Sequence, residues 1–279
     1  MSNRRTKPAS LGLLSLLGLL LLTGCWREPT EQSRAAISAA QSSILGTFYV
    51  ARINVYNKAR GMTDAENAAI QQLAATLGHG LLHFDSTGFC QSIYYGRYTR
   101  DRYLVQGTNL SIRDSTFRDL DLRPNGFSMR LGKRVNGKPV DLEYRAYRLN
   151  LGKDANRFLE LANTIFRKPA APQSDEQIRQ RVKHTLTFYA LFFRAIHDSH
   201  IILFKPGIVN LPINFYYGAI ALTPFSATDA WATLYATPDD AAKAYALLEE
   251  AVAKNGRFRH RRSFALGFST VLNETASHL

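Results

Sequence analysis

Cysteine is scarce in this chain: its 279 residues include only two, Cys25 and Cys90. A disulfide framework of the kind that stabilises small secreted proteins needs several pairs of thiols, so this class of protein is excluded. Neither cysteine has other cysteines or histidines at a spacing typical of zinc sites. Cys90 follows Phe89, and we predict that it is a small, buried apolar residue.

Long apolar runs are also missing from the chain beyond residue 25. The most apolar later stretches, 185–196 and 208–224, are interrupted by Arg194, Asn210 and Asn214 as well as by prolines. A helix that spans a bilayer needs about 20 predominantly apolar residues. We therefore predict that both stretches belong to the core of a folded domain.

Motifs of the common hydrolases and nucleotide-binding proteins are absent as well. There is no Gly-x-Ser-x-Gly and no His-Glu-x-x-His sequence. Segment 126–133 resembles a phosphate-binding loop, but its glycines have the wrong spacing, and Arg134 stands where Ser or Thr would hold magnesium. We therefore predict no catalytic residue, no bound metal and no cofactor.

Two groups of titratable residues nevertheless keep an enzymatic alternative open. His197, Asp198 and His200 provide two imidazoles and a carboxylate within four residues, although a histidine near a helix C-terminus is also favoured by the helix dipole. Carboxylates two residues apart lie on one face of a strand, and glycosidases use a pair of carboxylates. These carboxylates are Asp119 and Asp121, and Asp141 and Glu143. The simpler interpretation is a strand face that is acidic and solvated, with arginines opposite.

The most informative motif that is present lies at the N-terminus. Arg4, Arg5 and Lys7 precede the Leu-rich segment Leu11 to Leu22, and the run ends in Leu22-Thr23-Gly24-Cys25. About a dozen apolar residues is the length of a signal peptide and too short to span a bilayer. The closing tetrapeptide resembles the lipobox of bacterial lipoproteins.

That resemblance implies an address for the protein. Residues 1–24 would be a signal peptide that is removed, and Cys25 would carry the lipid that attaches the protein to the membrane. Two or three acyl chains anchor a protein firmly, whereas one binds only marginally. Residue 26 is Trp rather than Asp. In lipoproteins of Gram-negative type this implies transfer to the outer membrane, and we expect the protein on its periplasmic face.

The charge of the chain restricts its partners. The formal net charge is +13 with a pI near 9.9, and removal of the three basic residues in segment 1–24 leaves +10. Such a protein is attracted to anionic surfaces, which in the envelope are anionic lipid and cell-wall polymer. Nucleic acid is not expected as a partner of an exported lipoprotein.

The remainder of the chain predicts an α+β protein. Residues 25–34 form a polar tether, and residues 35–279 form a single α+β domain, strand-rich over 80–151 and helix-rich over 152–279. We expect an antiparallel sheet of about five to seven strands with three to four packed helices, because strands precede helices instead of alternating with them. The expected strands are 92–98, 103–106, 117–122, 127–135 and 140–149, with further candidates at 201–204 and 213–222.

Local signals place the turns and helices. Asn136-Gly137 is a favoured two-residue hairpin turn. Capping boxes at 63–66 and 174–177 each begin a helix, and Thr237-Pro238 begins a third. A weaker helical pattern covers 155–166. Segment 46–56 has enough Phe, Tyr, Val and Ile to be a strand, but the Ala-rich residues before it leave a helix open.

One segment combines tyrosines and arginines in a way that suits recognition. Tyr and Arg are enriched among the residues that dominate binding energy at protein interfaces. The segment lies between residues 94 and 103, and the predicted partner-binding residues are Tyr94, Tyr95, Arg97, Tyr98, Arg100 and Arg102. The alternative is a hairpin in which these side chains pack on one another across two strands.

A dense basic run follows the third helix. Its arginines are Arg257, Arg259, Arg261 and Arg262. Basic residues near an anionic membrane surface contribute about 1 kcal/mol each to binding, so this run is a candidate site for anionic lipid or cell-wall polymer. The alternative is an ordinary solvated segment.

Together these features predict an outer-membrane lipoprotein that acts by binding. It would bind a protein of the cell envelope, as an accessory, an adaptor or an inhibitor. One alternative is an enzyme that acts on cell wall or lipid with a site dispersed in the sequence. A second is a carrier of apolar molecules, which the many Phe and Tyr residues suggest.

Overall fold

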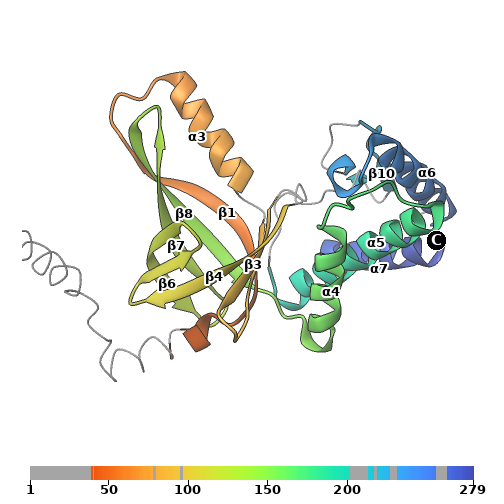
Figure 1. Ribbon diagram of the computed structural model, residues 1–279, viewed down its shortest axis with the longest axis horizontal. Coiled ribbons are helices and arrows are strands. Elements are labelled where there is room, and N and C mark those ends of the chain that lie inside the picture. Colours follow the sequence, from red (N-terminus) through yellow and green to blue (C-terminus); the bar gives the residue numbers. More distant parts are fainter. Residues whose placement is uncertain are drawn as a thin grey trace, which may run out of the picture.

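The computed structural model describes residues 39, 41–77, 80–94, 97–201, 213–216, 219–226, 231–255 and 263–279. These residues form a β-barrel and a helical unit that lie side by side, which confirms the predicted α+β class (Figure 1). Among the described residues, no helix has both the length and the apolar character that crossing a bilayer requires.

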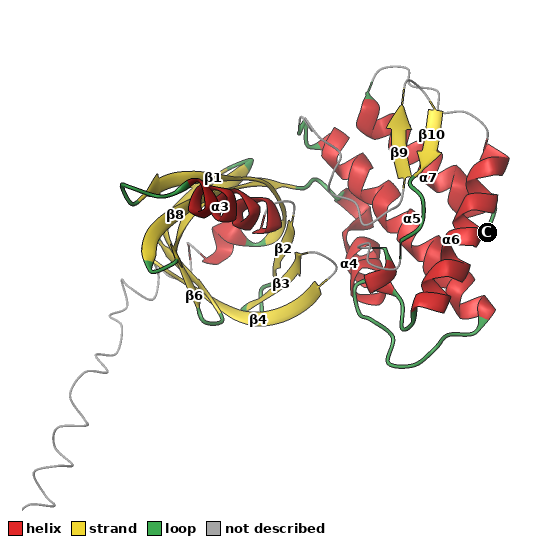
Figure 2. Ribbon diagram, turned by 90° about the horizontal axis from the view of Figure 1, so that it is seen from above, coloured by secondary structure: helices red, strands yellow, loops and turns green. Residues whose placement is uncertain are grey.

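Eight antiparallel strands form the barrel, and each pairs with its neighbours in sequence. The barrel closes because the first strand also pairs with the last, over Phe48↔Arg148 to Lys58↔Val140 (Figure 2). The strands are β1 (Gly46–Lys58), β2 (Gly80–Phe84), β3 (Phe89–Tyr94), β4 (Arg97–Gln106), β5 (Asn109–Ile112), β6 (Ser115–Arg123), β7 (Gly126–Val135) and β8 (Lys138–Arg148).

The predicted sheet of five to seven strands was too small. Strands β2 and β5 have only five and four residues, which is too short to show a recognisable alternation of apolar and polar positions. Segment 46–56, for which the sequence allowed either a strand or a helix, belongs to strand β1. The expected strand 92–98 was wrong, because β3 ends at Tyr94 and β4 begins at Arg97.

The prediction of a two-residue hairpin turn at Asn136-Gly137 was correct. Asn136 and Gly137 have φ values of 49° and 79°, as a two-residue turn with both central residues in the left-handed region requires. The turn places Val135 opposite Lys138, and pairing then continues without interruption to Gly126↔Tyr147. The outer face of β7 and β8 is therefore regular along its whole length.

Aromatic side chains fill the interior of the barrel. Phe48 contacts Phe84 and Phe127 edge-to-face, with ring centroids 6.0 and 4.9 Å apart, and Phe117 meets Tyr144 at 5.3 Å. Edge-to-face pairs of this kind are typical of a packed core. The structure therefore does not favour the interpretation of the barrel as a carrier for apolar molecules.

Helix α3 (Asp64–Leu77) covers one end of the barrel, where Ile70 and Ala74 join the barrel core (Figures 1 and 2). The predicted capping box is present: Thr63 N–H donates to Glu66 at 2.8 Å, and Glu66 N–H donates to Thr63 Oγ1 at 3.2 Å. Lys138 Nζ also lies 2.8 Å from the Glu66 carboxylate. This contact fixes the start of α3 to the β7–β8 turn.

The helical unit is built around one long helix. Helix α5 (Asp175–Asp198) packs against α4 (Ala155–Ile165), α6 (Pro238–Asn255) and α7 (Phe264–Ser277). The remaining elements are the 3₁₀ turns η1 (Gly152–Asp154) and η2 (Ala232–Leu234), and the strands β9 (Ile213–Tyr216) and β10 (Ala219–Leu222). Strands β9 and β10 form a hairpin, so the expected single strand over 213–222 was wrong.

The predicted helix starts were correct. Ser174 and Gln177 form both bonds of a capping box at α5, and Thr237 Oγ1 accepts the Asp240 N–H at α6. Helix α7 has no comparable signal apart from the single cap Ser263, and the sequence did not predict it. Several of its buried positions are Ser, Thr or Ala, so its buried face does not stand out in the sequence.

The barrel and the helical unit share an apolar seam. The described residues contain two hydrophobic clusters, one inside the barrel and one among the helices. Three residues on the outer face of β1 to β3, namely Tyr49, Leu81 and Ile93, belong to the helical cluster. Tyr49 packs edge-to-face on Phe192 of α5 at 5.4 Å. This seam positions the end of β8 beside the end of α5.

Candidate functional site

The described arginines of the predicted Tyr-Arg surface on β4 already contact other residues of the barrel. The guanidinium carbons of Arg100 and Arg102 lie 4.3 and 5.0 Å from the centroid of the Phe89 ring on β3. Arg100 also forms an ion pair with Asp85 at 3.3 Å. These contacts are the cross-strand packing of the alternative interpretation.

The other predicted residues of that surface either pack against the helical unit or lie outside the described residues. Tyr98 packs against the helical cluster, with the guanidinium carbon of Arg167 at 5.2 Å from its ring centroid. Tyr95 and the side chains of Tyr94 and Arg97 lie outside the described residues. The partner-binding role of this segment stays a prediction, and the visible geometry favours a site elsewhere.

Two further predicted sites lie outside the described residues. Cys25 falls in segment 1–38, and the basic run falls in segment 256–262. The basic run consists of Arg257, Arg259, Arg261 and Arg262. Their roles in lipid attachment and in binding anionic surfaces stay predictions.

The four strand carboxylates each pair with an arginine. These ion pairs are Arg130–Asp119 at 3.0 Å, Arg123–Asp121 at 2.5 Å, Arg118–Asp141 at 2.9 Å and Arg145–Glu143 at 3.1 Å. A register shift between Arg118 and Asp121, with Asp119 at φ 54°, also interrupts the predicted alternation of β6. The acidic residues belong to a charged outer face, as the simpler interpretation predicts, and do not form a pair of catalytic carboxylates.

The histidine group does not converge on one point. His197 Nδ1 lies 2.9 Å from Ser263 Oγ, Asp198 lies 3.9 Å from Arg194, and His200 is exposed with φ 55°. The described residues contain no group of three or more side chains that could ligate a metal. Cys90 is fully buried in the barrel core, and burial raises its pKa to about 12, so it is a poor nucleophile.

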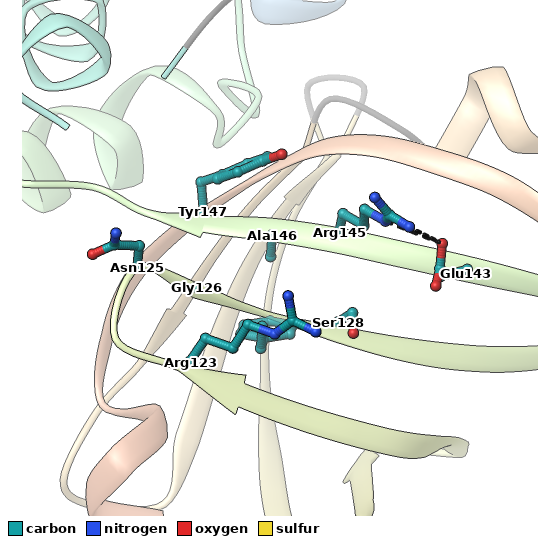
Figure 3. A pocket seen from close by; sticks show the side chains of 9 residues that line it. Arg123, Asn125, Gly126, Ser128, Glu143, Arg145, Ala146 and Tyr147 are labelled. Atoms are coloured by element: carbon teal, nitrogen blue, oxygen red, sulfur yellow. Dashed lines mark hydrogen bonds and ion pairs between the residues drawn. The ribbon is translucent and has the colours of Figure 1, made fainter. Parts of the chain in front are cut away.

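A pocket of about 240 Å³ lies on the outer face of β6, β7 and β8 (Figure 3). We call it the β7 notch. Its lining residues are Arg123, Asn125, Gly126, Phe127, Ser128, Glu143, Arg145, Ala146 and Tyr147. The strand register explains its shape. Gly126 lies between Arg123 and Tyr147, and Ser128 lies between Asp121 and Arg145, so two small residues are flanked by long side chains from both neighbouring strands.

A second hollow of about 680 Å³ opens where the barrel meets the helical unit. We call it the junction cleft. The barrel side includes Thr47, His83, Asn125, Tyr147 and Arg148, and the linker and helical side includes Asn150, Ala155, Asp198, Ser199 and His200. Asn125 and Tyr147 line both hollows. The β7 notch and the junction cleft therefore adjoin at these two residues, and we call the two hollows together the groove.

Several contacts hold the junction cleft in shape. Thr47 Oγ1 lies 2.9 Å from His83 Nδ1, and the Asn150 N–H donates to Ser199 Oγ at 2.7 Å across the junction. Arg148 donates to the Ser43 carbonyl at 2.9 Å, and its guanidinium stacks on Phe48. Burial lowers the pKa of His83 below its usual value, although the Asp85 carboxylate opposes the shift. His83 is therefore mostly neutral at pH 7.

The residues of the groove were missed because their neighbours come from other strands. Tyr147 is one of the few large hydrophobic side chains in the described part that are exposed, at 41 %. Its position in an alternating strand indicates that it points outward, but nothing local indicates that Arg123 and Ser128 lie nearby.

Comparisons with protein-family models, with curated proteins and with solved structures gave no match.

Proposed function

We propose that this protein is a lipid-anchored binding protein of the bacterial outer membrane, and that it binds its partner in the groove formed by the β7 notch and the junction cleft. The lipobox supports the location. The groove supports binding over catalysis, because its described side chains supply hydrogen-bond donors, acceptors and an aromatic ring. Its hydroxyl–imidazole contact, between Thr47 Oγ1 and His83 Nδ1, involves a threonine that is only 6 % exposed and so offers little access to a substrate.

We choose this surface because of the exposure of Tyr147. Tyr147 is exposed at the point that the two hollows share, whereas Arg100 and Arg102 of β4 pack on Phe89 and Tyr98 packs against the helical unit. Ligand sites occur preferentially between structural units. Tyr and Arg also dominate interface energies when they lie in the centre of a site.

The anchor is tested by changing its attachment residue. Cys25→Ser removes the only thiol in the lipobox, so we expect complete loss of labelled palmitate from the protein and its release from the membrane fraction. The measurement is metabolic labelling followed by fractionation of the cells, with Cys90→Ser as the control that keeps its label. A Cys25→Ser protein labelled as strongly as wild type would refute the anchor.

The binding surface is tested by photo-crosslinking in intact cells. A photoreactive phenylalanine analogue at Tyr147 is expected to give a discrete adduct. The same analogue at Leu104, which is 39 % exposed on β4, is the matched control and should give none. Equal adducts at both positions, or no adduct at Tyr147, would contradict the proposed surface.

A further inference from the structure

We infer that the groove binds a glycan strand, and that in the periplasm this ligand is the sugar chain of the cell wall. The inference rests on the proposed function, since the location comes from the predicted lipid anchor. It depends on three properties of the groove: its charge balance, its exposed aromatic ring and the absence of a free strand edge at its floor.

The charge balance of the β7 notch is nearly neutral. Arg123 Nε donates to Asp121 at 2.8 Å, and Arg145 Nε donates to Glu143 at 3.1 Å. Two positive and two negative groups leave little net attraction for a phosphate dianion. They do provide both donors and acceptors, which is what the hydroxyl groups of a sugar need.

The two arginines still have donors to offer. Among the contacts of the described residues, the Nη1 atom of each has no hydrogen-bond partner, and both side chains are more than half exposed. The ion pairs restrict their rotamers, so less conformational entropy is lost when a ligand binds. Figure 3 shows Arg123 extending from β6 toward Ser128, which supplies a hydroxyl to the notch.

Tyr147 supplies the aromatic surface. Its ring is exposed at the rim, where the C–H face of a sugar can pack on it while its hydroxyl remains in water. Because Tyr147 and Asn125 line both hollows, a ligand long enough to extend past these two residues would reach the junction cleft from the notch. This continuity suits a chain of sugar units better than a single small molecule.

A peptide partner fits the same groove less well. Extended peptides commonly bind by adding a strand to the free edge of a sheet. At the groove, β7 is paired with both β6 and β8, so its backbone has no free hydrogen-bonding edge. A peptide would have only side-chain contacts there. A sugar chain needs no backbone pairing.

Sedimentation with purified cell-wall sacculi tests the inference, with the mature lipidated protein, from Cys25 to Leu279, in mild detergent. We expect Tyr147→Ala and Arg145→Gln each to raise the Kd at least about tenfold. Leu104→Ala and Arg118→Gln are the controls and should bind like wild type. Arg118 matches Arg145 because it is 56 % exposed, against 54 %, and is also paired with a carboxylate. Raising NaCl from 0.1 to 0.5 M should weaken wild-type binding by less than about threefold, because the notch is nearly neutral.

Three results would overturn the inference. One is a wild-type protein that does not sediment with sacculi. The second is binding that is unchanged in Tyr147→Ala and Arg145→Gln and is abolished by salt, which would indicate non-specific attraction of a basic protein. The third is stronger binding to lipopolysaccharide micelles than to sacculi, lost in the same two variants. A protein adduct at Tyr147 without sacculus binding would overturn the glycan assignment and leave the proposed binding surface intact.

Discussion

Arg181→Met is expected to lower the free energy of unfolding by about 3 kcal/mol, because it removes three charge-assisted hydrogen bonds from the centre of the helical unit. Arg181 is only 6 % exposed. Its guanidinium donates to the carbonyls of Ile165, Arg167 and Leu234 at 2.6–2.7 Å. Two of these acceptors lie at the end of α4, and the third is in η2, so one side chain joins three elements. Methionine has a similar length but donates to none of them.

Chemical unfolding followed by circular dichroism measures this effect. Arg179→Met is the matched control, because Arg179 lies on the same helix, is 43 % exposed and has a long ion pair of 4.0 Å with Glu176. Such surface pairs contribute between 0 and about 1 kcal/mol, so the control should change stability by less than about 0.5 kcal/mol. Equal losses in the two variants would show that the three carbonyl contacts do not stabilise the helical unit.

Gly126→Ala is expected to destabilise the barrel by about 3 kcal/mol or more. Gly126 has φ 153°, and a Cβ atom added there would lie 2.0 Å from the carbonyl oxygen of Ala146. A backbone conformation that only glycine adopts readily costs about 1–3 kcal/mol for another residue, and the clash with a backbone atom adds to this cost. The start of β7 would have to move away from β8. Since Gly126 is also the floor of the β7 notch, partner binding should weaken together with stability.

Gly132→Ala is the control for this variant. Gly132 lies on the same strand, has no positive φ, and its added Cβ would meet its nearest atoms at 3.5 Å, an ordinary contact distance. Its free energy of unfolding, measured in denaturant, should stay within about 0.5 kcal/mol of wild type. A Gly126→Ala protein as stable as the control would show that the start of β7 tolerates a side chain.

The parts of the fold that could be predicted depend on residues close in sequence. The cap at Ser174 involves Gln177, and the turn at Asn136 involves Gly137, so a few neighbouring residues determine each. Strand β5 and helix α7 could not be found in this way. β5 has four residues between two longer strands, and the buried face of α7 mixes Phe268, Val271 and Leu272 with small and hydroxyl residues, so its apolar periodicity is weak.

The site was predicted less well for a related reason. The segment from Tyr94 to Arg102 is rich in recognition residues, but Phe89 and Asp85 on the neighbouring β3 strand and turn occupy its arginines. Conversely, Arg123, Ser128 and Tyr147 are ordinary residues of three separate strands. Only the register of β6, β7 and β8 brings them together. Sequence composition indicates which residues can bind, and strand pairing decides which of them are available.

The closure of the barrel also determines when the protein can fold. Phe48 pairs with Arg148, so β1 obtains one of its two partner strands only after about 100 further residues have been synthesised. Contacts between such distant positions form late, because a long loop has to close before they stabilise the chain. The barrel therefore stays open while β8 is still being made. In the exported protein that we propose, a barrel that is still open could be threaded through a secretion channel until its last strand has been released.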